Sequence, residues 1–488
     1  MTDRPNTEHP HRPGSWRRCL TGAAALLLCL SACEVGPDYK RPAAPTPAAY
    51  KEETKDWKIA QPQQAGSNQA WWSIYNDPVL DDLEKQVAIS NESVKSSEAA
   101  YRQAVALVGE ARAGFFPTLS LDTSLQQSHQ QSKSTTQYSG SVGATWEIDI
   151  WGKIRREVES AKAGAQVSAA DLAAAKLSLQ AELATDYFQL RTEDELQRLL
   201  NATVDAFARS LQIAQNRYDV GVAAKTDVAS AQAQLESTRA QAINVGVLRS
   251  QLEHAIAVLI GKPPADFALA PAPGVVSAVP LTPPGLPSQL LERRPDIAAA
   301  ERQMAEANAQ IGVAVSAYYP SITLEGSVGV AATALSSLFA PESLVWAVGP
   351  SLAETLFDGG LRGAQVEAAK ASFDQTVALY RQTVLTAFQQ VEDQLAALRI
   401  LAQQAAVQDG AVKAAQEAER LTLNQYEAGT LDYTSVITAQ ANALSSQQTA
   451  LGILQNRVAA SVSLIAALGG GWDTSQLPQN PEPPLTFP

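Results

Sequence analysis

The chain has few of the residue types that build metal centres, disulfide frameworks or nucleophilic active sites. Its 488 residues include 3 cysteines and 4 histidines, and two of the cysteines, Cys19 and Cys29, lie close to the N-terminus. The histidines are scattered and form no cluster with metal-ligand spacing. No phosphate-binding glycine loop and no strand–turn–helix nucleophile motif is present. We therefore expect no metal, no organic cofactor and no enzymatic activity.

Positive charge is also scarce. Lysine and arginine together number 37, against 50 aspartates and glutamates, which gives a formal net charge of −13 at pH 7. A protein of this sign is repelled by phosphate backbones, so nucleic acid is not an expected partner. The apolar stretch Leu20–Leu30 is shorter than the roughly 20 residues that a membrane-spanning helix needs. That stretch therefore fits an export signal better than a membrane helix.

The N-terminus carries the features of a lipoprotein export signal. The apolar stretch follows a basic segment and ends in Leu30-Ser31-Ala32-Cys33. This tetrapeptide is similar to the bacterial lipobox, in which the signal is cut before a cysteine that then carries lipid. We predict that residues 1–32 are removed and that Cys33 is lipidated, although an ordinary signal peptide that contains a cysteine is the alternative. Glu34 at the next position favours sorting to the outer membrane.

The chain contains an internal duplication. The motif Phe115-Phe116-Pro117 returns as Tyr318-Tyr319-Pro320, and Tyr218–Gly221 returns as Tyr426–Gly429, in each case roughly 200 residues later. Echoes in the same order and at nearly one spacing indicate two copies of one unit. The predicted organisation is a lipid-anchored tether at 33–70, a first repeat at 71–261, a linker at 262–287, a second repeat at 288–472 and a flexible C-terminal tail at 473–488.

Each repeat contains two segments in which apolar and polar residues alternate. In the first segment Leu119, Leu121 and Leu125 alternate with polar residues. Period-two alternation predicts half-exposed β-strands, here at about 117–128, 136–150, 320–331 and 343–357. A soluble sandwich would show the same alternation, but we find no further strands on which these could pack.

The predicted strands cannot close a barrel within one chain, and open sheet edges are not tolerated in lipid. Three copies would supply twelve strands, which lies within the range of outer-membrane barrels. In such a barrel the apolar faces contact lipid and the polar faces line the lumen. We therefore predict an α+β membrane protein in which several chains contribute strands to one barrel. The residues expected to make its lumen acidic are Asp122, Glu147, Asp149 and Glu325.

A long helical segment without proline follows each strand pair, at 152–217 and 359–425. Each would extend roughly 100 Å at 1.5 Å per residue, which is too long for one globular core. Returning helices are expected at 226–259 and 433–468, so the helices form a projecting coiled coil. A periplasmic scaffold without a pore would also explain these helices, but it leaves the alternating strands without a purpose. Trp71–Tyr75 is expected to form a short additional strand.

Further motifs follow one another along the chain: Leu30–Cys33, Trp71-Trp72 with Asp77-Pro78, Phe115–Pro117, Leu290–Asp296, Tyr318–Pro320, Gly349–Leu352, Leu356–Gly360 and Ala466–Trp472. Together they resemble the outer-membrane factors of tripartite efflux and secretion systems, the TolC-like channels. Within that family the chain is most similar to the lipidated OprM/NodT branch. The resemblance covers the mature chain apart from its C-terminal tail.

The resemblance implies a homotrimer whose twelve-stranded barrel lies in the outer membrane of a Gram-negative bacterium. This barrel continues into a long periplasmic α-helical barrel. The resemblance also implies a channel that docks at its periplasmic tip to an adaptor protein and an inner-membrane RND-type pump. The cargo would then be small molecules such as drugs and other toxic compounds. The alternative within the family is the exit duct of an ABC-type (type I) protein secretion system.

The turns between outgoing and returning helices match the short motif that the family uses for adaptor docking. Glycine there would also serve simply as a helix cap, and Ala428 departs from the Val-Gly form of the motif. Near the turns lie candidates for a periplasmic gate, although Asp227 and Asp432 are equally suited to cap helices. The docking candidates are Val220, Gly221, Val222, Ala428, Gly429 and Thr430. The gate candidates are Leu431, Asp432, Tyr433, Asp219 and Asp227.

Overall fold

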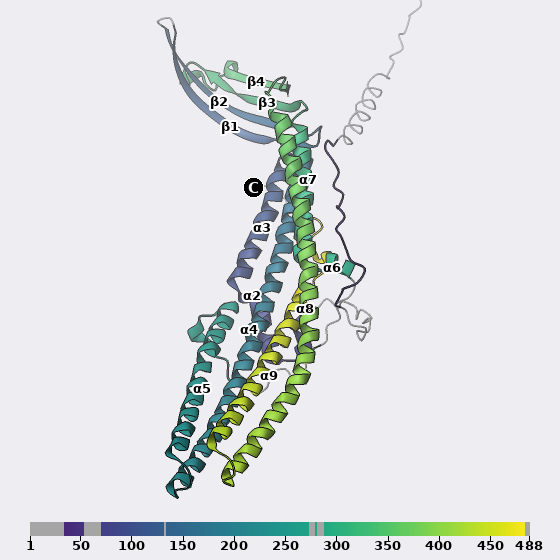
Figure 1. Ribbon diagram of the computed structural model, residues 1–488. Helices are drawn as coiled ribbons and strands as arrows, with labels where there is room; N and C mark the ends of the chain where they lie inside the picture. Colours follow the sequence, from purple (N-terminus) through teal and green to yellow (C-terminus); the bar gives the residue numbers. More distant parts are fainter. Residues whose placement is uncertain (1–33, 53–69, 131–132, 273–278, 281–286, 484–488) are drawn as a thin grey trace, which may run out of the picture.

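The computed structural model describes residues 34–52, 70–130, 133–272, 279–280 and 287–483. The predicted signal peptide at 1–32 and the lipidation candidate Cys33 lie outside the described residues. The protein is elongated: a curved β-sheet lies at one end, and long helices run from it to the opposite end (Figure 1). Helices therefore account for most of the length of the molecule.

The long helices of the described chain occur in two pairs of identical length. The outgoing helices α4 (Lys153–Asp219) and α8 (Leu361–Glu427) each have 67 residues. The returning helices α5 (Lys225–Leu259) and α9 (Tyr433–Ala467) each have 35 residues. The predicted outgoing and returning helices are therefore confirmed. By length and composition α9 could cross a membrane, but it packs along α8 and α4.

Shorter helices precede each strand pair. α2 (Pro78–Ser90) and α3 (Glu92–Ala113) lead into the first pair, and α6 (Pro287–Arg293) and α7 (Pro295–Ser316) lead into the second. The strand expected at Trp71–Tyr75 is wrong, because this segment forms the 3₁₀ helix η1. Its adjacent tryptophans are buried in one core cluster, whereas a strand would point them to opposite faces. Further 3₁₀ turns are η2 (Pro264–Asp266), η3 (Leu335–Ser337), η4 (Pro341–Ser343) and η5 (Thr474–Gln476).

The strands of the described chain form one antiparallel sheet in the order β1-β2-β3-β4. The bounds are β1 (Thr118–Gln130), β2 (Lys133–Glu147), β3 (Ser321–Ala332) and β4 (Leu344–Ala353). The predicted strands are confirmed, but their ends differ. β1 and β2 continue into the segment between the predicted ranges 117–128 and 136–150, because their pairing extends to Gln130 and Lys133. β2 ends at Glu147 and β4 at Ala353, before the predicted ends at 150 and 357.

One set of sheet side chains is apolar and exposed. Leu119 and Leu121 of β1 are each 74% exposed, and Trp346 of β4 is 72% exposed. β1 and β4 each pair with a neighbour on one side within the described chain. An apolar surface between two open edges is typical of a sheet that is completed by further copies and surrounded by lipid.

Two hydrophobic clusters hold the helical part together. The first joins η1 and α2 to α4, α5 and α9, and it includes Trp71, Leu183, Ile256 and Val462. The second joins α6 and α7 to α8 and α9, and Tyr50 of the N-terminal segment belongs to it. Because the first cluster combines residues from both repeats, the two repeats form one folded unit, and the second cluster attaches the N-terminal segment to the second repeat.

Both ends of the described chain are fastened more firmly than the sequence indicated. Residues 34–52 of the expected tether form hydrogen bonds with α4, α7 and α8. At the other end, Glu482 forms ion pairs with Arg112 of α3 and with Lys162 of α4, each at 2.6 Å. The tail therefore packs on the coil as far as this residue, in place of the flexible tail expected. Long-range charge pairs of this kind leave no periodic signal in the sequence.

Candidate functional site

The turns between outgoing and returning helices lie at the end of the molecule farthest from the sheet (Figure 1). Gly221 and Gly429 occupy the left-handed region in these turns, both with φ 77°. The N–H of Gly221 donates to the carbonyl oxygen of Tyr218 at 2.8 Å, and the N–H of Gly429 donates to that of Tyr426 at 2.9 Å. A left-handed residue directly after a helix favours glycine. Both glycines therefore cap helices, and their docking role stays a prediction.

The docking candidates are all exposed in one chain, but the two turns differ in their surroundings. A Cβ at Gly221 would meet no atom within 4 Å, whereas a Cβ at Gly429 would lie 3.5 Å from Nη2 of Arg217. The first turn therefore presents an open surface, and a cation borders the second. The exposed candidates are Val220, Gly221, Val222, Ala428, Gly429 and Thr430.

The two helical hairpins meet at the tip through one arginine and two tyrosines, which we name the tip cluster. The guanidinium of Arg217 lies 4.8 Å from the ring centroid of Tyr426, and its Nη1 donates to the carbonyl oxygen of Glu427 at 2.9 Å. Tyr426 and Tyr433 pack edge to face, with ring centroids 5.0 Å apart. Both tyrosines are 2% exposed. Sequence reasoning missed Arg217 and Tyr426, for which the position beside the turn motifs is the available signal.

Burial and a nearby acid shift the titration of the tip cluster. Burial, together with Tyr426 and Asp227, raises the pKa of Tyr433 to about 12. Burial and Asp227 also raise the pKa of Tyr426, against the opposing effect of Arg217. Both phenols are therefore neutral at physiological pH. Asp227 lies close enough to both rings to be the acidic member of this site.

The two aspartates that could cap helices have different roles. Asp432 is the N-cap of α9, because its Oδ1 accepts hydrogen bonds from the N–H and Oγ of Ser435 at 2.8 and 3.0 Å. These bonds lower the pKa of Asp432. The N-cap of α5 is Ala224, which offers no side-chain hydrogen bond, so Asp227 lies in the first turn of that helix instead.

The structure brings Tyr433 and Asp227 together and leaves the other gate candidates apart. Asp219 lies at the end of α4, where its Oδ1 accepts a hydrogen bond from Nε2 of Gln215 at 2.8 Å. Leu431 is half-buried in the turn that precedes α9. A passage between copies would be closed by residues from several chains, so the gate stays a prediction.

The acidic residues predicted for the lumen lie in different settings. Asp122 belongs to β1 and Glu325 to β3. Glu147 is the last residue of β2, and its Oε1 lies 3.6 Å from Nζ of Lys153. Asp149 lies beyond the end of the strand, so its expected place within a strand is wrong. The lumen-lining role of these acids stays a prediction.

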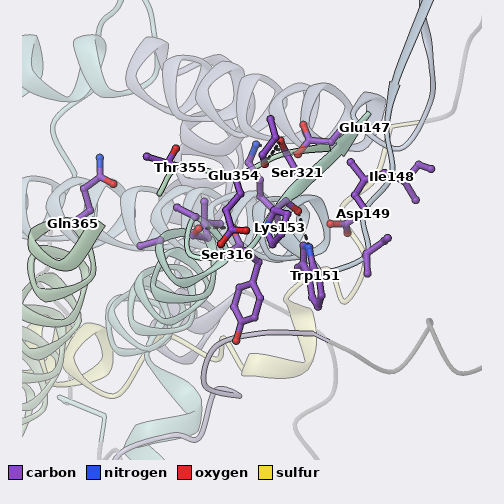
Figure 2. A pocket seen from close by; sticks show the side chains of 18 of the residues that line it. Glu147, Ile148, Asp149, Trp151, Lys153, Ser316, Ser321, Glu354, Thr355 and Gln365 are labelled. Atoms are coloured by element: carbon purple, nitrogen blue, oxygen red, sulfur yellow. Dashed lines mark hydrogen bonds and ion pairs between the residues drawn. The ribbon is translucent and has the colours of Figure 1, made fainter. Parts of the chain in front are cut away.

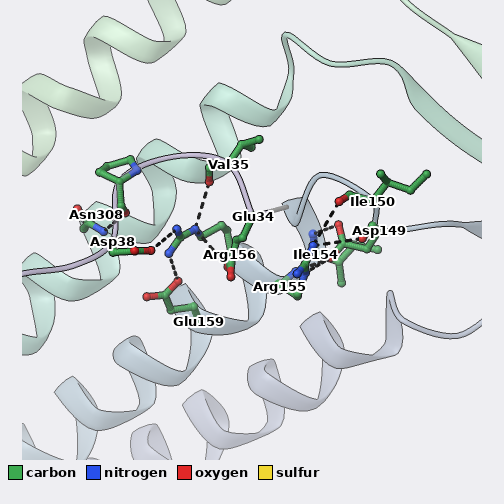
Figure 3. Close-up of polar contacts among 11 residues, drawn as sticks. Glu34, Val35, Asp38, Asp149, Ile150, Ile154, Arg155, Arg156, Glu159 and Asn308 are labelled. Atoms are coloured by element: carbon green, nitrogen blue, oxygen red, sulfur yellow. Dashed lines mark hydrogen bonds and ion pairs between the residues drawn. The ribbon is translucent and has the colours of Figure 1, made fainter. Parts of the chain in front are cut away.

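Asp149 caps the beginning of α4 (Figure 3). Its carboxylate accepts hydrogen bonds from the N–H groups of Ile154 and Arg155 at 3.1 and 3.0 Å, and it pairs with the Arg155 side chain at 3.3 Å. The second repeat has the same device, because Asp358 pairs with Arg362 at 2.5 Å. A carboxylate near a helix N-terminus satisfies free amides and interacts favourably with the helix dipole. Because Asp149 is bound to the first amides of α4, it lies outside β2, which ends at Glu147.

A hollow of about 530 Å³ lies where the sheet meets the helices (Figure 2). Trp151 forms part of its wall: the ring stacks on Tyr319 with centroids 4.9 Å apart, and Nε1 donates to the carbonyl oxygen of Pro320 at 2.8 Å. Polar and apolar side chains both line the hollow, including Glu147 and Lys153. Among the described residues, no group of acidic, histidine or cysteine side chains is arranged to hold a metal.

Comparison with known proteins agrees with this architecture. The sequence model of the family "Outer membrane efflux protein" matches residues 83–262 and 286–470, one match in each repeat. The chain belongs to the outer membrane efflux protein family. It is 30% identical over 468 residues to the toluene efflux pump outer membrane protein TtgC of Pseudomonas putida, covering 93% of this chain and 96% of TtgC. It is 30% identical over 474 residues to the outer membrane protein OprJ of Pseudomonas aeruginosa, covering 94% and 97%.

Solved structures resemble about nine tenths of the chain. The outer-membrane channel OprN superposes with a TM-score of 0.84 at 29% identity and covers 90% of this chain and 100% of its own. The open state of the MtrE outer membrane channel of Neisseria gonorrhoeae superposes with a TM-score of 0.81 at 29% identity, covering 91% and 99%. CusC superposes with a TM-score of 0.81 at 25% identity, covering 90% and 100%.

These relatives establish the class of the protein. The chain is an outer-membrane efflux channel, and three copies supply twelve strands to one barrel. The sheet end of the channel therefore lies in the outer membrane of a Gram-negative bacterium, and the helical end extends into the periplasm. The family consists of channels and not of enzymes, and such a channel requires no cofactor.

Proposed function

We propose that this channel is the exit duct of a tripartite efflux pump. A periplasmic adaptor and an inner-membrane RND-type pump would deliver small molecules to its periplasmic end. The observation that carries the proposal is the pair of equivalent, exposed turns at the end of the coil farthest from the sheet. Relatives are named for the efflux of toluene, solvents and antibiotics, which supports small and largely apolar cargo.

The adaptor is proposed to dock on the turns of both repeats. Val220 and Val222 are 72% and 62% exposed in the first turn, and apolar side chains at this density favour contact with another helical hairpin. Ala428 and Thr430 in the second turn offer smaller side chains. Because Arg217 borders the second turn, the two turns would contribute unequally to the interface.

The periplasmic tip is proposed to form the gate. Three-fold symmetry would repeat each acid around the axis, and a ring of carboxylates attracts cations and repels itself. Asp227 belongs to the first hairpin and raises the pKa of Tyr426 and Tyr433 in the second, so it is the acid at the contact between the two hairpins. The remaining members of the proposed gate are Asp219, Leu431, Asp432 and Tyr433.

Cys33 is proposed to carry lipid and to anchor the mature N-terminus in the outer membrane. The course of the chain just after it supports this role. The N–H of Val35 donates to the carbonyl oxygen of Trp151 at 3.1 Å, at the junction of sheet and helices. Replacing Cys33 by alanine should abolish acyl labelling, and labelling that persists would contradict the assignment.

Cross-linking through the first turn in living cells tests the proposed function. A photoreactive residue at Val222 should capture an adaptor, and affinity purification should recover that adaptor together with an RND-type pump. The matched control carries the same residue at Ile89 of α2, which is 73% exposed and lies outside the tip. It should not capture the adaptor. Capture of a component of an ABC exporter at Val222 would replace small-molecule efflux by protein secretion.

A further inference from the structure

The N-terminal segment Glu34–Glu52 crosses three helices of the coil. Arg156 of α4 fastens its first residues: the guanidinium pairs with Glu34 at 3.3 Å and with Asp38 at 3.0 Å (Figure 3). Nε of Arg156 also donates to the carbonyl oxygen of Val35 at 3.3 Å. The Arg156 side chain is 3% exposed, whereas its partners Glu34 and Asp38 are 36% and 89% exposed, so a buried cation holds two acids that remain in contact with water. The start of the segment is therefore fixed to the junction of sheet and helices.

The middle of the segment follows α7 and reaches α8. Nδ2 of Asn308 donates to the carbonyl oxygen of Pro37 at 2.8 Å, and the hydroxyl of Tyr39 donates to Oε1 of Glu301 at 2.7 Å. Nη2 of Arg41 then donates to the hydroxyl of Tyr380 on α8 at 3.0 Å. The segment thus runs along the wall of the coil, from the sheet towards the tip, with a fastening on each helix that it crosses.

The segment ends in a set of contacts with α8 that we name the lower clamp, formed by Tyr50, Lys51, Glu52, Glu392 and Arg399. The carboxylate of Glu392 accepts hydrogen bonds from the N–H groups of Lys51 and Glu52 at 2.7 and 3.0 Å. Oε2 of Glu52 pairs with Nη2 of Arg399 at 2.6 Å. Tyr50 is 4% exposed. The lower clamp therefore joins a buried anchor to two charged contacts.

The first repeat has an equivalent fastening. Arg191 occupies the same position in α4 as Arg399 does in α8, counted from the first residue of each helix. Nη1 of Arg191 donates to the carbonyl oxygen of Ala270, which belongs to the linker that leads into the second repeat. The segment that leads into each repeat is thus held by an arginine on the long helix of the other repeat. This repetition indicates a geometric role in the fold rather than an incidental surface contact.

The lower clamp marks a change in how α8 is packed. Towards the sheet, α8 buries Tyr380, Val384, Phe388 and other side chains, but between Leu395 and Tyr426 it buries no side chain within the described chain. Hollows of about 490 Å³ between α4, α8 and α9, and of about 480 Å³ between α8 and α9, lie along this stretch. From the lower clamp to the tip cluster, the described chain therefore restrains α8 mainly through α9, and the rest of its surface remains for a neighbouring copy.

We propose that the lower clamp positions the fulcrum about which the α8–α9 hairpin swings when the periplasmic tip opens. The proposal rests on the gate proposed above at the periplasmic tip. The segment is attached at the sheet–helix junction and ties the middle of α8 to that point. The α8–α9 hairpin therefore bends between Arg399 and the tip and not nearer to the membrane. Glu392 and Arg399 are positioning residues in this device, because they act through α8 and contact no cargo.

The test uses the full-length trimer in planar lipid bilayers, where the open fraction of the resting channel is recorded. Arg399→Glu places two acids together, and Glu392→Ala releases the two N–H groups. Each should raise the open fraction about three- to tenfold, since a bias of this size follows from one or two lost polar contacts. The double variant Glu52→Arg with Arg399→Glu restores the pair in reverse and should return to the wild-type value. Arg420→Glu disrupts the exposed pair with Glu417 further along α8 and should change nothing.

An opposite intervention keeps the proposal testable if a clamp variant fails to assemble. Cysteines in place of Glu52 and Arg399, joined by a short bifunctional thiol reagent, should lower the open fraction, and a cleavable reagent should make the effect reversible. Wild-type and double-variant open fractions that equal that of Arg399→Glu, with trimers intact on unheated gels, would overturn the proposal. Current that never switches between closed and open levels, in the wild type and in every variant, would instead contradict the gate proposed at the periplasmic tip.

Discussion

The two long hairpins of this channel have identical helix lengths but different packing. α4 buries side chains from Ile154 to Ala214, whereas the tip-proximal part of α8 buries none within the described chain until Tyr426. α4 lies between α3 and α7 and packs on both, while α8 packs on α7 and α9. The position of each helix in the channel wall therefore decides how many of its side chains are buried within one chain, because the far side of α8 remains for a neighbouring copy. The duplication preserved the backbone and changed what each helix contacts.

Equivalent arginines show the same contrast at one site. The Arg191 side chain is 6% exposed and pairs with Asp194 at 3.0 Å, and Asp194 also pairs with Arg249 of α5 at 2.7 Å. The Arg399 side chain is 38% exposed and pairs with Glu52. The position of Asp194 is occupied in α8 by Ala402, which cannot form an ion pair. A buried ionic network thus fastens the first hairpin, and a partly hydrated pair fastens the second.

The largest expected effect comes from breaking the buried network. Asp194→Ala leaves the guanidinium groups of Arg191 and Arg249 without their shared carboxylate, and removing one partner of a buried network costs about 3 kcal/mol of unfolding free energy. Arg399→Ala should cost about 1 kcal/mol or less, because exposed pairs contribute little. Urea unfolding of the detergent-solubilised trimer, followed by circular dichroism at 222 nm, measures both.

Glu236→Ala is the matched control for this comparison. It removes an acid from the same hairpin, but the acid belongs to an exposed pair with Arg239, so a loss of about 0.5 kcal/mol or less is expected. Equal losses for Asp194→Ala and Arg399→Ala would show that the two hairpins are fastened alike, against the contrast drawn here.

A second difference between the two repeats concerns the hydrogen-bond partners of one buried glutamate in each. Glu301 of α7 accepts a hydrogen bond from Tyr39 and pairs with Arg302, whereas both oxygens of Glu84 in α2 are buried without a hydrogen-bond partner. Burial, reinforced by Asp81, raises the pKa of Glu84 to about 9 from 4.5. The folded protein keeps a proton that the unfolded chain releases, so stability falls as the pH rises from about 4.5 to about 9.

Glu84→Gln should therefore stabilise the channel at pH 8 by about 1–3 kcal/mol, because an amide avoids the cost of a buried ionisable acid. The gain should shrink as the pH falls towards 5. Glu301→Gln should have the opposite sign, since it weakens the bonds to Tyr39 and Arg302. Urea unfolding at pH 5 and pH 8 measures both variants. A Glu84→Gln difference that does not depend on pH would contradict the raised pKa.

Sequence patterns predicted the parts of the fold that repeat along the chain. Proline-free helical segments of about 65 residues gave the long helices, and period-two alternation gave the strands, because both patterns follow from backbone geometry. Glycine in the turns predicted the tip, since a left-handed cap restricts the residue type. The ends of β1 and β2 were missed because their hairpin is polar on both faces and alternation cannot mark it.

Contacts between distant segments were outside the reach of these patterns. The fastening of Glu482 on α3 and α4, and that of Glu52 on α8, join residues with no shared period. The sequence did not predict the tip cluster for the same reason. Arg217 and Tyr426 lie in different hairpins and come into contact only where the two hairpins converge. Asp149 fitted the alternation of a strand, and its role as a cap depends on where α4 begins.

The glycines of the two turns offer a smaller test. Gly221→Ala and Gly429→Ala both place a Cβ at φ 77°, so each should lose about 1 kcal/mol of stability. Cross-linking efficiency to the adaptor should then separate them. The open turn at Gly221 should tolerate the added methyl group sterically, whereas at Gly429 the methyl group lies 3.5 Å from Arg217 and should disturb the tip cluster. Equal cross-linking by both variants would remove the proposed inequality of the turns.

The smallest expected change in stability comes from Asp432→Asn. This variant keeps a side chain that can cap α9 and removes its negative charge, so it distinguishes the capping role of Asp432 from the role of its charge. α9 has a side-chain cap in Asp432, while α5 begins after Ala224 without one, so the variant alters the hairpin that carries the cap. Asparagine caps as well as aspartate, so stability at pH 7 should stay the same. Hydrogen bonds lower the pKa of Asp432 in the folded state, and the stability they contribute is therefore lost as the pH falls through that lowered pKa.

The asparagine variant should show no such loss in acid, which pH-dependent unfolding would detect. If Asp432 also belongs to a ring of carboxylates at the tip, removing its charge lowers the cation preference of the open channel. That preference is read from the reversal potential in a salt gradient. An unchanged reversal potential, together with unchanged stability at pH 7, would assign Asp432 to helix capping alone. The acid of the gate would then have to be sought at Asp227, where the first hairpin meets the tyrosines of the second.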